Sequence, residues 1–353
     1  MRARLDEPSW WYGDGERAGR SLGRSVMARC LAPLGALYGW AAQARYTRAK
    51  PYRSHLPVVC VGNLTAGGTG KTPLALHLCG HLQAAGLRPA VLTRGYGGSH
   101  AGPHWVAGGD GADAVGDEAL LLARAAPTLV SRDRAAGAQA IEARAAYDVI
   151  VMDDGLQNPQ LAKDLTLAVV DGTRGLGNSR VMPAGPLRAP LGFQLGLVDA
   201  VVVNARGPGT SDAVADRLRR RFDGPILRCA TVAAGDAAWF NGRRVVAWAG
   251  IAAPQRFFAM LRSLGAEVVE TTAFGDHQRL TEADARRLLA LAERRGAILV
   301  STAKDMARLT GAAGSLAALA AATRVLPIAL HFAAPDAERL AALIRSTVEK
   351  RRA

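Results

Sequence analysis

The sequence predicts an α/β protein built on a mostly parallel sheet. Apolar segments of strand length alternate along the chain with segments of helical periodicity, which is the pattern of parallel strands joined by helices. The expected strands are 57–62, 89–93, 126–130, 147–153, 165–171, 198–204, 243–249, 297–301 and 324–330. A chain of 353 residues also has room for two domains with separate cores.

The first element in order is an N-terminal segment, residues 1–50. Between Arg29 and Arg45 it holds an uncharged stretch, CLAPLGALYGWAAQA, which is shorter than the about 20 apolar residues that cross a membrane. Its apolar side chains fall near one helical face and a basic run follows: Leu31, Leu34, Leu37, Tyr38, Trp40 and Ala41, then Arg45, Arg48, Lys50 and Arg53. This pattern predicts an amphipathic helix in a membrane interface. A helix that packs on a core and carries a solvated basic tail is the alternative.

The expected core, residues 51–235, opens with a glycine-rich loop between a strand and a helix. In the segment 58–73, VVCVGNLTAGGTGKTP, the residues expected to bind nucleotide are Thr65, Ala66, Gly67, Gly68, Thr69, Gly70, Lys71 and Thr72. Such a loop turns backbone N–H groups onto phosphates, while its lysine adds charge and its threonine hydroxyl ligates Mg²⁺. Thr65 stands where the generic pattern has glycine. A loop without a ligand is the alternative, but it leaves Lys71 beside Thr72 without a reason.

A second nucleotide element lies in the segment 147–155, YDVIVMDDG. An apolar strand that ends in carboxylates is the form of a Walker B segment, which presents an aspartate to the Mg²⁺ of a bound nucleotide. Asp153 and Asp154 are adjacent, so their side chains are expected to diverge. The expected metal ligands are therefore Thr72 with Asp153 and Asp154, and which of the two aspartates contacts the ion stays open. Together the two elements predict a P-loop NTPase-type core, although acidic residues also commonly cap strand ends.

A smaller C-terminal α/β lobe, residues 236–353, is expected to follow, with its linker between Gly207 and Gly242. Three polar clusters lie outside the nucleotide elements: the pair Asp117 and Glu118, the knot around His277, and the loop that carries Arg180 and Arg188. Each has a structural alternative, because acids favour the first turn of a helix, a histidine beside a cap is usually structural, and loop arginines are usually solvated.

The net charge limits the classes of binding partner that are expected. The formal net charge is +14, which favours an anionic partner: nucleic acid, an acidic membrane face or a phosphorylated substrate. Nucleic acid is not expected, because aromatic residues are only 5% and no nucleic-acid-binding spacing appears. No obligate protein partner is evident. The four cysteines are scattered without metal or redox spacing, which suits a reducing cytoplasm.

Taken jointly, the motifs resemble one family, the tetraacyldisaccharide 4'-kinases that phosphorylate the lipid A precursor in Gram-negative bacteria. The ordered series is VGNLT (61–65) with GGTGKTP (67–73), TRGYGG (93–98), VGDE (115–118), DDGLQ (153–157), PAGPLR (183–188), AGIA (249–252), Asp276 with His277, and Thr302 with Lys304 and Asp305. The series spans nearly the whole chain. Thr65 at the first loop position is usual in this family.

The resemblance implies transfer of the γ-phosphoryl group of ATP, with Mg²⁺, to the 4'-hydroxyl of a tetraacylated glucosamine disaccharide 1-phosphate, an anionic glycolipid. It implies peripheral attachment to the cytoplasmic face of the inner membrane. It also implies a catalytic dyad of Asp117 and His277 that activates the sugar hydroxyl. Which of the two takes the proton stays open. Arg94, Arg134 and Arg188 are candidates for stabilising charge on the phosphoryl group or on the substrate's 1-phosphate.

Three positions depart from the usual family pattern, namely Asn158, Ala189 and Gln278, and no metal role is expected near residue 189. With Asp117 in the core and His277 in the second lobe, we expect the site between the lobes and closure of the lobes to assemble the dyad. Two other classes compete. A dimeric switch ATPase usually has a lysine where this chain has Ala66, and a nucleic-acid-dependent ATPase would be stimulated by DNA or RNA.

Overall fold

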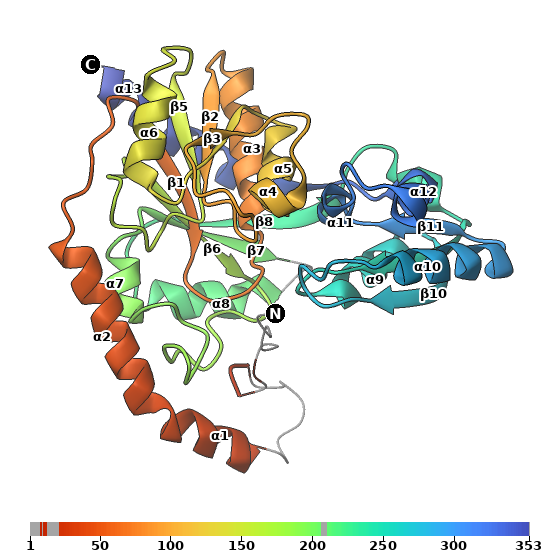
Figure 1. The fold of residues 1–353 in the computed structure, drawn as a ribbon. Helices are drawn as coiled ribbons and strands as arrows, with labels where there is room; N and C mark the ends of the chain where they lie inside the picture. The colour runs from red at the N-terminus through yellow and green to blue at the C-terminus, as the bar shows by residue number, and fades with distance from the viewer. Residues whose placement is uncertain (1–7, 9, 13–20, 206–209, 353) are drawn as a thin grey trace. The chain divides into compact units, whose positions relative to one another are not determined.

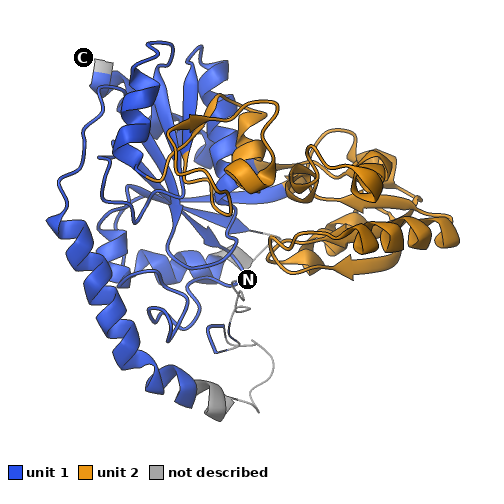
Figure 2. Cartoon of the chain, viewed as in Figure 1, with its two compact units in different colours: residues 1–92, 133–231, 331–353 blue, residues 93–132, 232–330 orange. Residues whose placement is uncertain are grey.

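The computed structural model describes residues 8, 10–12, 21–205 and 210–352. Parts of the expected N-terminal segment (1–7, 9 and 13–20) and of the expected linker (207–209) therefore lie outside the described residues. The chain forms two compact units, which Figure 2 distinguishes by colour. Unit 1 comprises residues 1–92, 133–231 and 331–353, and unit 2 comprises residues 93–132 and 232–330.

Unit 1 is built on a mostly parallel sheet that helices cover. Its elements are α1 (Ser21–Cys30), α2 (Ala32–Arg48), β1 (Val58–Asn63), α3 (Lys71–Ala84), β2 (Pro89–Thr93), α6 (Arg134–Glu142), β5 (Val149–Asp153), β6 (Leu165–Asp171), α7 (Leu191–Leu195), β7 (Ala200–Ala205), α8 (Thr210–Arg219), β8 (Ile226–Ala233), β13 (Ile328–Phe332) and α13 (Ala334–Arg352). The strands follow the order β13-β8-β7-β6-β1-β5-β2. Helix α3 packs on β1 and β5, and α8 packs on β7 (Figure 1).

The burial of the central strands explains why they read as continuous apolar runs. Strand β1 pairs in parallel with β5 on one side and β6 on the other, and every residue of all three strands is buried. Strands covered on both faces are apolar throughout rather than alternating. One core cluster combines alternate residues of β6 and β7 with side chains from the 176–198 region and α8: Ala168, Val170, Val201, Val203, Leu176, Leu187, Leu191, Leu195, Val198 and Leu218.

Unit 2 contains a second, smaller parallel sheet. Its elements are β3 (His104–Trp105), α4 (Ala112–Val115), α5 (Asp117–Ala123), β4 (Thr128–Val130), the 3₁₀ turn η2 (Ala237–Phe240), β9 (Arg244–Ala249), α9 (Pro254–Ser263), β10 (Glu267–Ala273), α10 (Glu282–Arg295), β11 (Ile298–Ser301), α11 (Ala303–Arg308), α12 (Gly314–Ala322) and β12 (Thr323–Val325). The sheet order is β10-β9-β11-β12.

Strand β9 separates two small cores, because its side chains alternate between the two faces of the sheet. Val245, Ala247 and Ala249 pack with side chains of α9, while Val246 and Trp248 pack with side chains of α10. Helix α10 begins with a capping box, in which Thr281 and Asp284 exchange side-chain to backbone hydrogen bonds. The α/β fold class with a parallel sheet is thus confirmed in both units.

The division into units differs from the expected one. A single boundary near residue 235 was expected, but residues 93–132 group with unit 2 and residues 331–353 return to unit 1. The reason is packing: Val115, Ala119, Leu120 and Val130 share a buried cluster with Ala307 of α11. The expected domains 51–235 and 236–353 are therefore replaced by the two observed units. Unit 1 combines 1–92, 133–231 and 331–353, and unit 2 combines 93–132 and 232–330.

The N-terminal helices of unit 1 dock through glycines. Gly35 and Gly39 are the buried residues of α2, and a Cβ on Gly35 would lie 2.7 Å from the carbonyl oxygen of Val181. Tyr46 packs edge-on against Phe193 of α7, with ring centroids 5.5 Å apart. Small residues thus bring the helix against the 181–190 loop, and the large apolar residues are left on other faces.

Those large apolar residues are exposed. Along α1 and α2, at the red end of the chain in Figure 1, they are Val26, Met27, Leu34, Leu37, Tyr38 and Trp40, and Trp40 is the most exposed of them at 62%. No helix among the described residues has both the length and the apolar character needed to cross a membrane. The expected apolar face is therefore mostly turned away from the protein, which agrees with an interfacial helix better than with a core-packing one.

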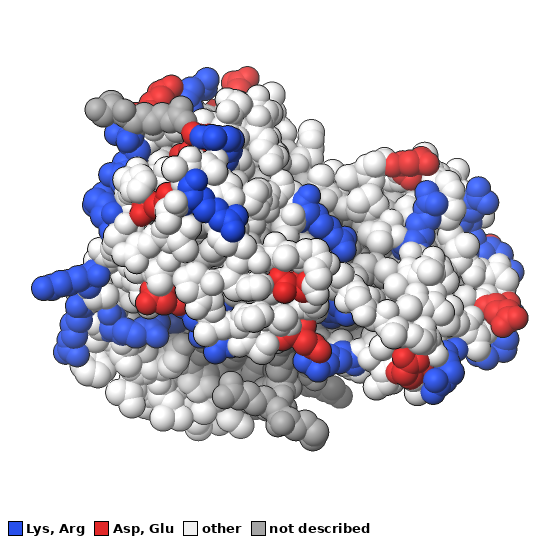
Figure 3. All heavy atoms as spheres, turned by 45° about the horizontal axis from the view of Figure 1, so that its top comes forward, with Lys and Arg blue, Asp and Glu red and all other residues white. Residues whose placement is uncertain are grey.

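On one face of the molecule the basic side chains are spread out. In the face that Figure 3 shows, Lys and Arg side chains are distributed across the molecule with Asp and Glu between them, rather than gathered in one stripe. A continuous basic stripe is the usual footprint of a nucleic-acid-binding surface. The four cysteines are free thiols, as their scattered spacing predicts.

Candidate active site

The glycine-rich loop connects β1 to α3 in unit 1. Gly67 and Gly70 both have positive φ angles, of 95° and 103°, which L side chains rarely adopt. A Cβ on Gly70 would also lie 2.6 Å from Nδ2 of Asn204. The loop therefore needs glycine at residue 70 for two reasons, its backbone conformation and the close approach of a neighbouring side chain. Helix α3 begins at Lys71, so its N-terminus faces the loop.

Polar atoms of this loop are buried. Thr65 and Thr69 are each 4% exposed, and within the described residues Oγ1 of Thr69 and Oδ1 of Asn63 have no hydrogen-bond partner. Unsatisfied buried polar atoms cost free energy, and they commonly mark the place of a water, ion or ligand. The loop thus offers both backbone geometry and polar atoms for a phosphate group.

The two aspartates of the Walker B segment differ in their surroundings. Asp153 ends β5, lies opposite Val61 of β1 and is 1% exposed. Asp154 has a φ of 49°, and its Oδ1 lies 3.8 Å from Nζ of Lys71 and 3.0 Å from Nη1 of Arg188. Burial raises the pKa of Asp154, but the positive charges of Lys71 and Arg188 outweigh burial and hold its pKa below the usual value. An ionised carboxylate thus lies beside the loop lysine.

Two of the three expected arginines lie with these aspartates in unit 1. Arg188 pairs with Asp154. Arg134 is the first residue of α6, is 2% exposed, and its Nη2 lies 3.5 Å from the backbone oxygen of Asp153. Arg94 is different, because it lies in unit 2 and its side chain is exposed. The structure therefore brings Arg134 and Arg188 together at the Walker B strand.

Asp117 and His277 contact each other inside unit 2. Asp117 opens α5 and is 4% exposed, and its two oxygens lie 3.0 and 2.8 Å from Nδ1 of His277. The residues are 160 positions apart in the chain. The expectation that closure of two lobes brings them together is therefore corrected: both residues belong to one unit, because 93–132 packs with the C-terminal sheet, and the pair is already formed.

The neighbours of the pair decide its protonation. Burial raises the pKa of Asp117, but the hydrogen bond with His277 and the positive charges of Lys304 and Arg308 outweigh burial, so its pKa lies well below the usual value. An ionised carboxylate only accepts hydrogen bonds, so Nδ1 of His277 carries the ring proton. Nε2 lies 3.0 Å from Nζ of Lys304, an ammonium group that only donates. These two contacts fit a ring that carries its proton on Nδ1 and accepts at Nε2.

Two basic residues that the sequence analysis did not assign complete this cluster. Lys304 also donates to Oε1 of Glu118 at 3.0 Å. Arg308 donates through Nε to Oδ2 of Asp117 at 2.8 Å and through Nη1 to the oxygen of Gly250 at 2.7 Å. Its Nη2 has no hydrogen-bond partner among the described residues. The sequence signal for Lys304 is the Thr302 to Asp305 motif, whereas Arg308 lies beyond that motif.

The pair borders a cavity of about 400 Å³ within unit 2. Its walls come from the 96–97 loop, α4, the start of α5, the His277 loop and the 308–316 segment, and they include Tyr96, Asp113, Asp117, His277, Arg279 and Arg308. The ring of Tyr96 meets that of His277 edge-on, 5.7 Å between centroids. A cavity of this size with a few convergent polar groups is typical of a small-molecule site.

The three positions that depart from the family pattern have local structural contacts. Asn158 exchanges hydrogen bonds with Gln160, at 3.0 and 2.9 Å. Gln278 accepts a hydrogen bond from the backbone N–H of Gly275 at 2.8 Å. Ala189 is buried, and its carbonyl oxygen accepts from Gln194 at 2.7 Å. Each residue stabilises a turn or loop beside a motif.

Comparisons with known proteins agree with these groupings. A family model described as tetraacyldisaccharide-1-P 4'-kinase matches residues 27–349. Proteins named tetraacyldisaccharide 4'-kinase are similar over nearly their full length: that of Methylobacterium nodulans is 48% identical over 95% of this chain and 96% of the relative, and that of Nitrobacter winogradskyi is 46% identical over 98% of each. The protein of Paramagnetospirillum magneticum is 47% identical over 93% of this chain and 95% of the relative.

A solved structure shares the fold. The crystal structure of LpxK from Aquifex aeolicus in complex with ATP aligns with a TM-score of 0.70, covering 91% of this chain and 99% of that chain at 24% sequence identity. At this identity the likeness concerns the fold alone.

Proposed function

Because the chain belongs to the tetraacyldisaccharide-1-P 4'-kinase family, we propose that it transfers the γ-phosphoryl group of ATP to the 4'-hydroxyl of tetraacyldisaccharide 1-phosphate. The product is the 1,4'-bisphosphate, and the reaction is a step of lipid A biosynthesis. The single observation that carries the chemistry is the buried Asp117–His277 pair at the wall of a cavity. A sugar hydroxyl is a poor nucleophile at neutral pH, so a positioned base is the group this reaction needs.

The nucleotide is assigned to unit 1. Residues 65–72 would hold the phosphates, and the buried hydroxyl of Thr69 without a partner supports a ligand in the loop. The hydroxyl of Thr72 and the carboxylates of Asp153 and Asp154 are the hard oxygen donors that Mg²⁺ prefers. When bound, the ion neutralises charge on the β- and γ-phosphate oxygens. Lys71 and Arg188, which now neutralise Asp154, supply the further positive charge, and Arg134 supports the Walker B strand.

The acceptor is assigned to the cavity of unit 2, with His277 as the base. The sugar O–H proton passes to Nε2 of His277 as the new O–P bond forms and the bond from phosphorus to the ADP oxygen breaks. Asp117 keeps the ring in the required tautomer and stabilises the imidazolium; its low pKa makes it the poorer proton acceptor. The hydroxyl must take the place of the Lys304 ammonium at Nε2. Nη2 of Arg308 offers a donor to a substrate oxygen.

Attachment to a membrane surface is assigned to α1 and α2. Their exposed apolar side chains, together with the basic residues that follow, suit the boundary between headgroups and acyl chains of an anionic leaflet. A tetraacylated substrate lies in a membrane, so a peripheral position at the cytoplasmic face of the inner membrane, where ATP is present, fits the proposed reaction. Arg94, exposed on unit 2, is retained as a candidate contact for substrate phosphate.

The test is phosphoryl transfer itself. Purified protein is incubated with Mg-ATP and tetraacyldisaccharide 1-phosphate in detergent micelles, and label transfer to lipid is followed. We expect transfer by the parent and a loss of about 10²- to 10⁴-fold in kcat for His277→Ala, the usual worth of a general base. Two matched controls should retain activity. His331→Ala changes an exposed histidine, and Asp216→Asn changes an exposed carboxylate.

The competing class predicts a different result. A switch or nucleic-acid-dependent ATPase would transfer nothing to lipid and would hydrolyse ATP only on addition of DNA, RNA or a protein partner. That outcome would overturn the lipid kinase. Full activity of an Asp117→Asn variant would be compatible with the kinase reaction but would contradict the proposed role of the Asp117–His277 pair.

A further inference from the structure

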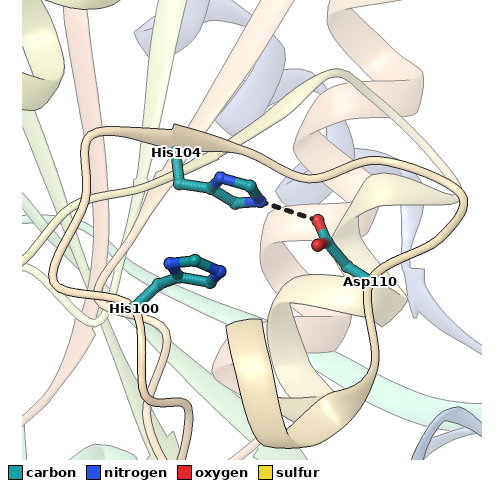
Figure 4. A group of neighbouring side chains, drawn as sticks. All are labelled: His100, His104 and Asp110. Atoms are coloured by element: carbon teal, nitrogen blue, oxygen red, sulfur yellow. Dashed lines mark hydrogen bonds and ion pairs between the residues drawn. The ribbon is translucent and has the colours of Figure 1, made fainter.

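A second cluster of polar side chains lies in unit 2, apart from the dyad. It consists of His100, in the loop before β3, His104, the first residue of β3, and Asp110, in the turn before α4. Nε2 of His104 lies 2.8 Å from Oδ2 of Asp110. The imidazole of His100 is stacked on that of His104, with centroids 4.2 Å apart and planes 7° from parallel. Figure 4 shows the three side chains gathered on one side of the loop.

The backbone holds all three residues in place. His104 pairs with Val130 in the antiparallel ladder of β3 and β4. The backbone N–H of His100 donates to the oxygen of Ala114 at 3.0 Å, and Oδ2 of Asp110 accepts from the backbone N–H of Ala107 at 2.9 Å. Side chains on anchored backbone can converge on an ion at little entropic cost.

We propose that His100, His104 and Asp110 form a binding site for a divalent transition-metal ion, best suited to Zn²⁺. One potential ligand atom from each residue lies within 4.8 Å of the others, so rotation of the imidazoles out of their stacked arrangement can bring all three to one ion. Two imidazoles and one carboxylate form a donor set that Zn²⁺ accepts, with water in the fourth position.

This site is distinct from the one proposed for Mg²⁺. Mg²⁺ demands oxygen ligands and dehydrates reluctantly, whereas imidazole nitrogen suits Zn²⁺. The ligands also lie in unit 2, while Thr72 and the Walker B aspartates lie in unit 1.

The ion would act as a structural clamp. His100 belongs to the loop that continues from Tyr96 and Gly97 of the cavity wall, and Asp110 precedes α4, which leads through Gly116 to Asp117. Two backbone hydrogen bonds already join these segments, from Ser99 to Asp113 and from His100 to Ala114. Coordination would add a cross-link between the same two segments and so stabilise the wall that carries the dyad aspartate.

The test is direct binding to the full chain after chelator treatment and desalting. Zn²⁺ is titrated calorimetrically, and Co²⁺ is added in parallel because its visible spectrum reports imidazole coordination. We expect saturable binding of one ion that millimolar Mg²⁺ does not displace. We expect each of three substitutions to weaken Zn²⁺ binding by about tenfold or more: His100→Ala, His104→Ala and Asp110→Asn. Loss of a direct ligand should lower metal affinity more than loss of a residue that only supports a ligand. The control His331→Ala removes an exposed histidine outside the cluster.

His100 is exposed, so His100→Ala tests the site with little risk to folding. Unchanged Zn²⁺ binding in His100→Ala and His104→Ala, or the absence of saturable binding in the parent, would overturn the proposal. A thermal-shift series gives a second readout, because an ion that binds only the folded state raises Tm. We expect Zn²⁺ to raise the Tm of the parent and of His331→Ala but not that of His104→Ala. Neither readout depends on phosphoryl transfer.

Discussion

Arg308 is the residue that ties the dyad to the C-terminal sheet. Its guanidinium contacts the carboxylates of Asp117 and Asp305, each at 2.8 Å, and the backbone oxygen of Gly250. All of these groups are largely buried, and its own side chain is 11% exposed. A buried charge network of this kind is weak evidence for net stability, but the loss of one partner leaves the others uncompensated.

We therefore expect Arg308→Met to lower the free energy of unfolding by about 3–5 kcal/mol, the usual cost of breaking a buried ion pair. Urea unfolding followed by circular dichroism measures this. The matched control is Arg279→Met, which removes an exposed arginine paired with exposed Asp113. Such surface pairs contribute about 0–1 kcal/mol. Equal effects of the two substitutions would show that the network does not stabilise the unit.

Asp117 gives a prediction about pH. Its pKa is lowered in the folded protein, so its interactions stabilise the protein fully above the unfolded-state value of about 3.9 and are lost as the pH falls through the folded value. The difference in unfolding free energy between the parent and Asp117→Asn should thus stay constant, within experimental error, between about pH 6 and pH 8. It should become smaller below about pH 4. A difference that instead grew with acid would contradict the assigned charge state.

Among the elements, α2 shows how one helix serves two surfaces. Its glycines face the 181–190 loop, where a side chain on Gly35 would collide with backbone, and its large apolar residues are exposed. The two roles separate by substitution. Changing the exposed face should leave the docked face, and with it the stability of unit 1, unaltered.

We expect the triple substitution of Leu34, Leu37 and Trp40 by Gln to weaken binding to anionic phospholipid vesicles by roughly tenfold or more, because each buried large apolar side chain contributes about 1.5–3 kcal/mol. Its Tm should match that of the parent, since all three side chains are exposed. Vesicle co-sedimentation and thermal unfolding are the two measurements. Gly35→Leu is the counterpart and should lower Tm. Unchanged vesicle binding in the triple variant would contradict an interfacial role for α2.

Across the whole molecule, the parts that local patterns encode were predictable and the parts that long-range packing decides were not. The loop at 65–72 and the Walker B strand follow from their own residues, because glycine conformation and strand hydrophobicity are local properties. Strand β10, with the sequence EVVETTA, was not predicted, since it is only partly buried and carries polar residues.

The expected candidate-site residues came from motifs and the resemblance, and their grouping needed the structure. Nothing local indicates that Asp117 meets a histidine 160 residues away, or that 93–132 packs with the C-terminal sheet. Lys304 and Arg308 escaped assignment for the same reason: each lies on α11, and their partners on α5 become neighbours only when unit 2 folds.

The last prediction concerns the proposed assignment of nucleotide binding to unit 1 and of the acceptor site to unit 2. If unit 1 alone binds nucleotide, Mg-ATP should stabilise the protein through residues of unit 1, by about 2.7 kcal/mol at a free concentration of a hundred times Kd. Lys71→Ala should lose most of this thermal shift, because the lysine adjoins the loop and Asp154. Asp117→Asn and His277→Ala should keep it in full while losing phosphoryl transfer. A dyad variant that lost the shift as well would mean that unit 2 also holds the nucleotide, and the assignment of ATP to unit 1 alone would fail.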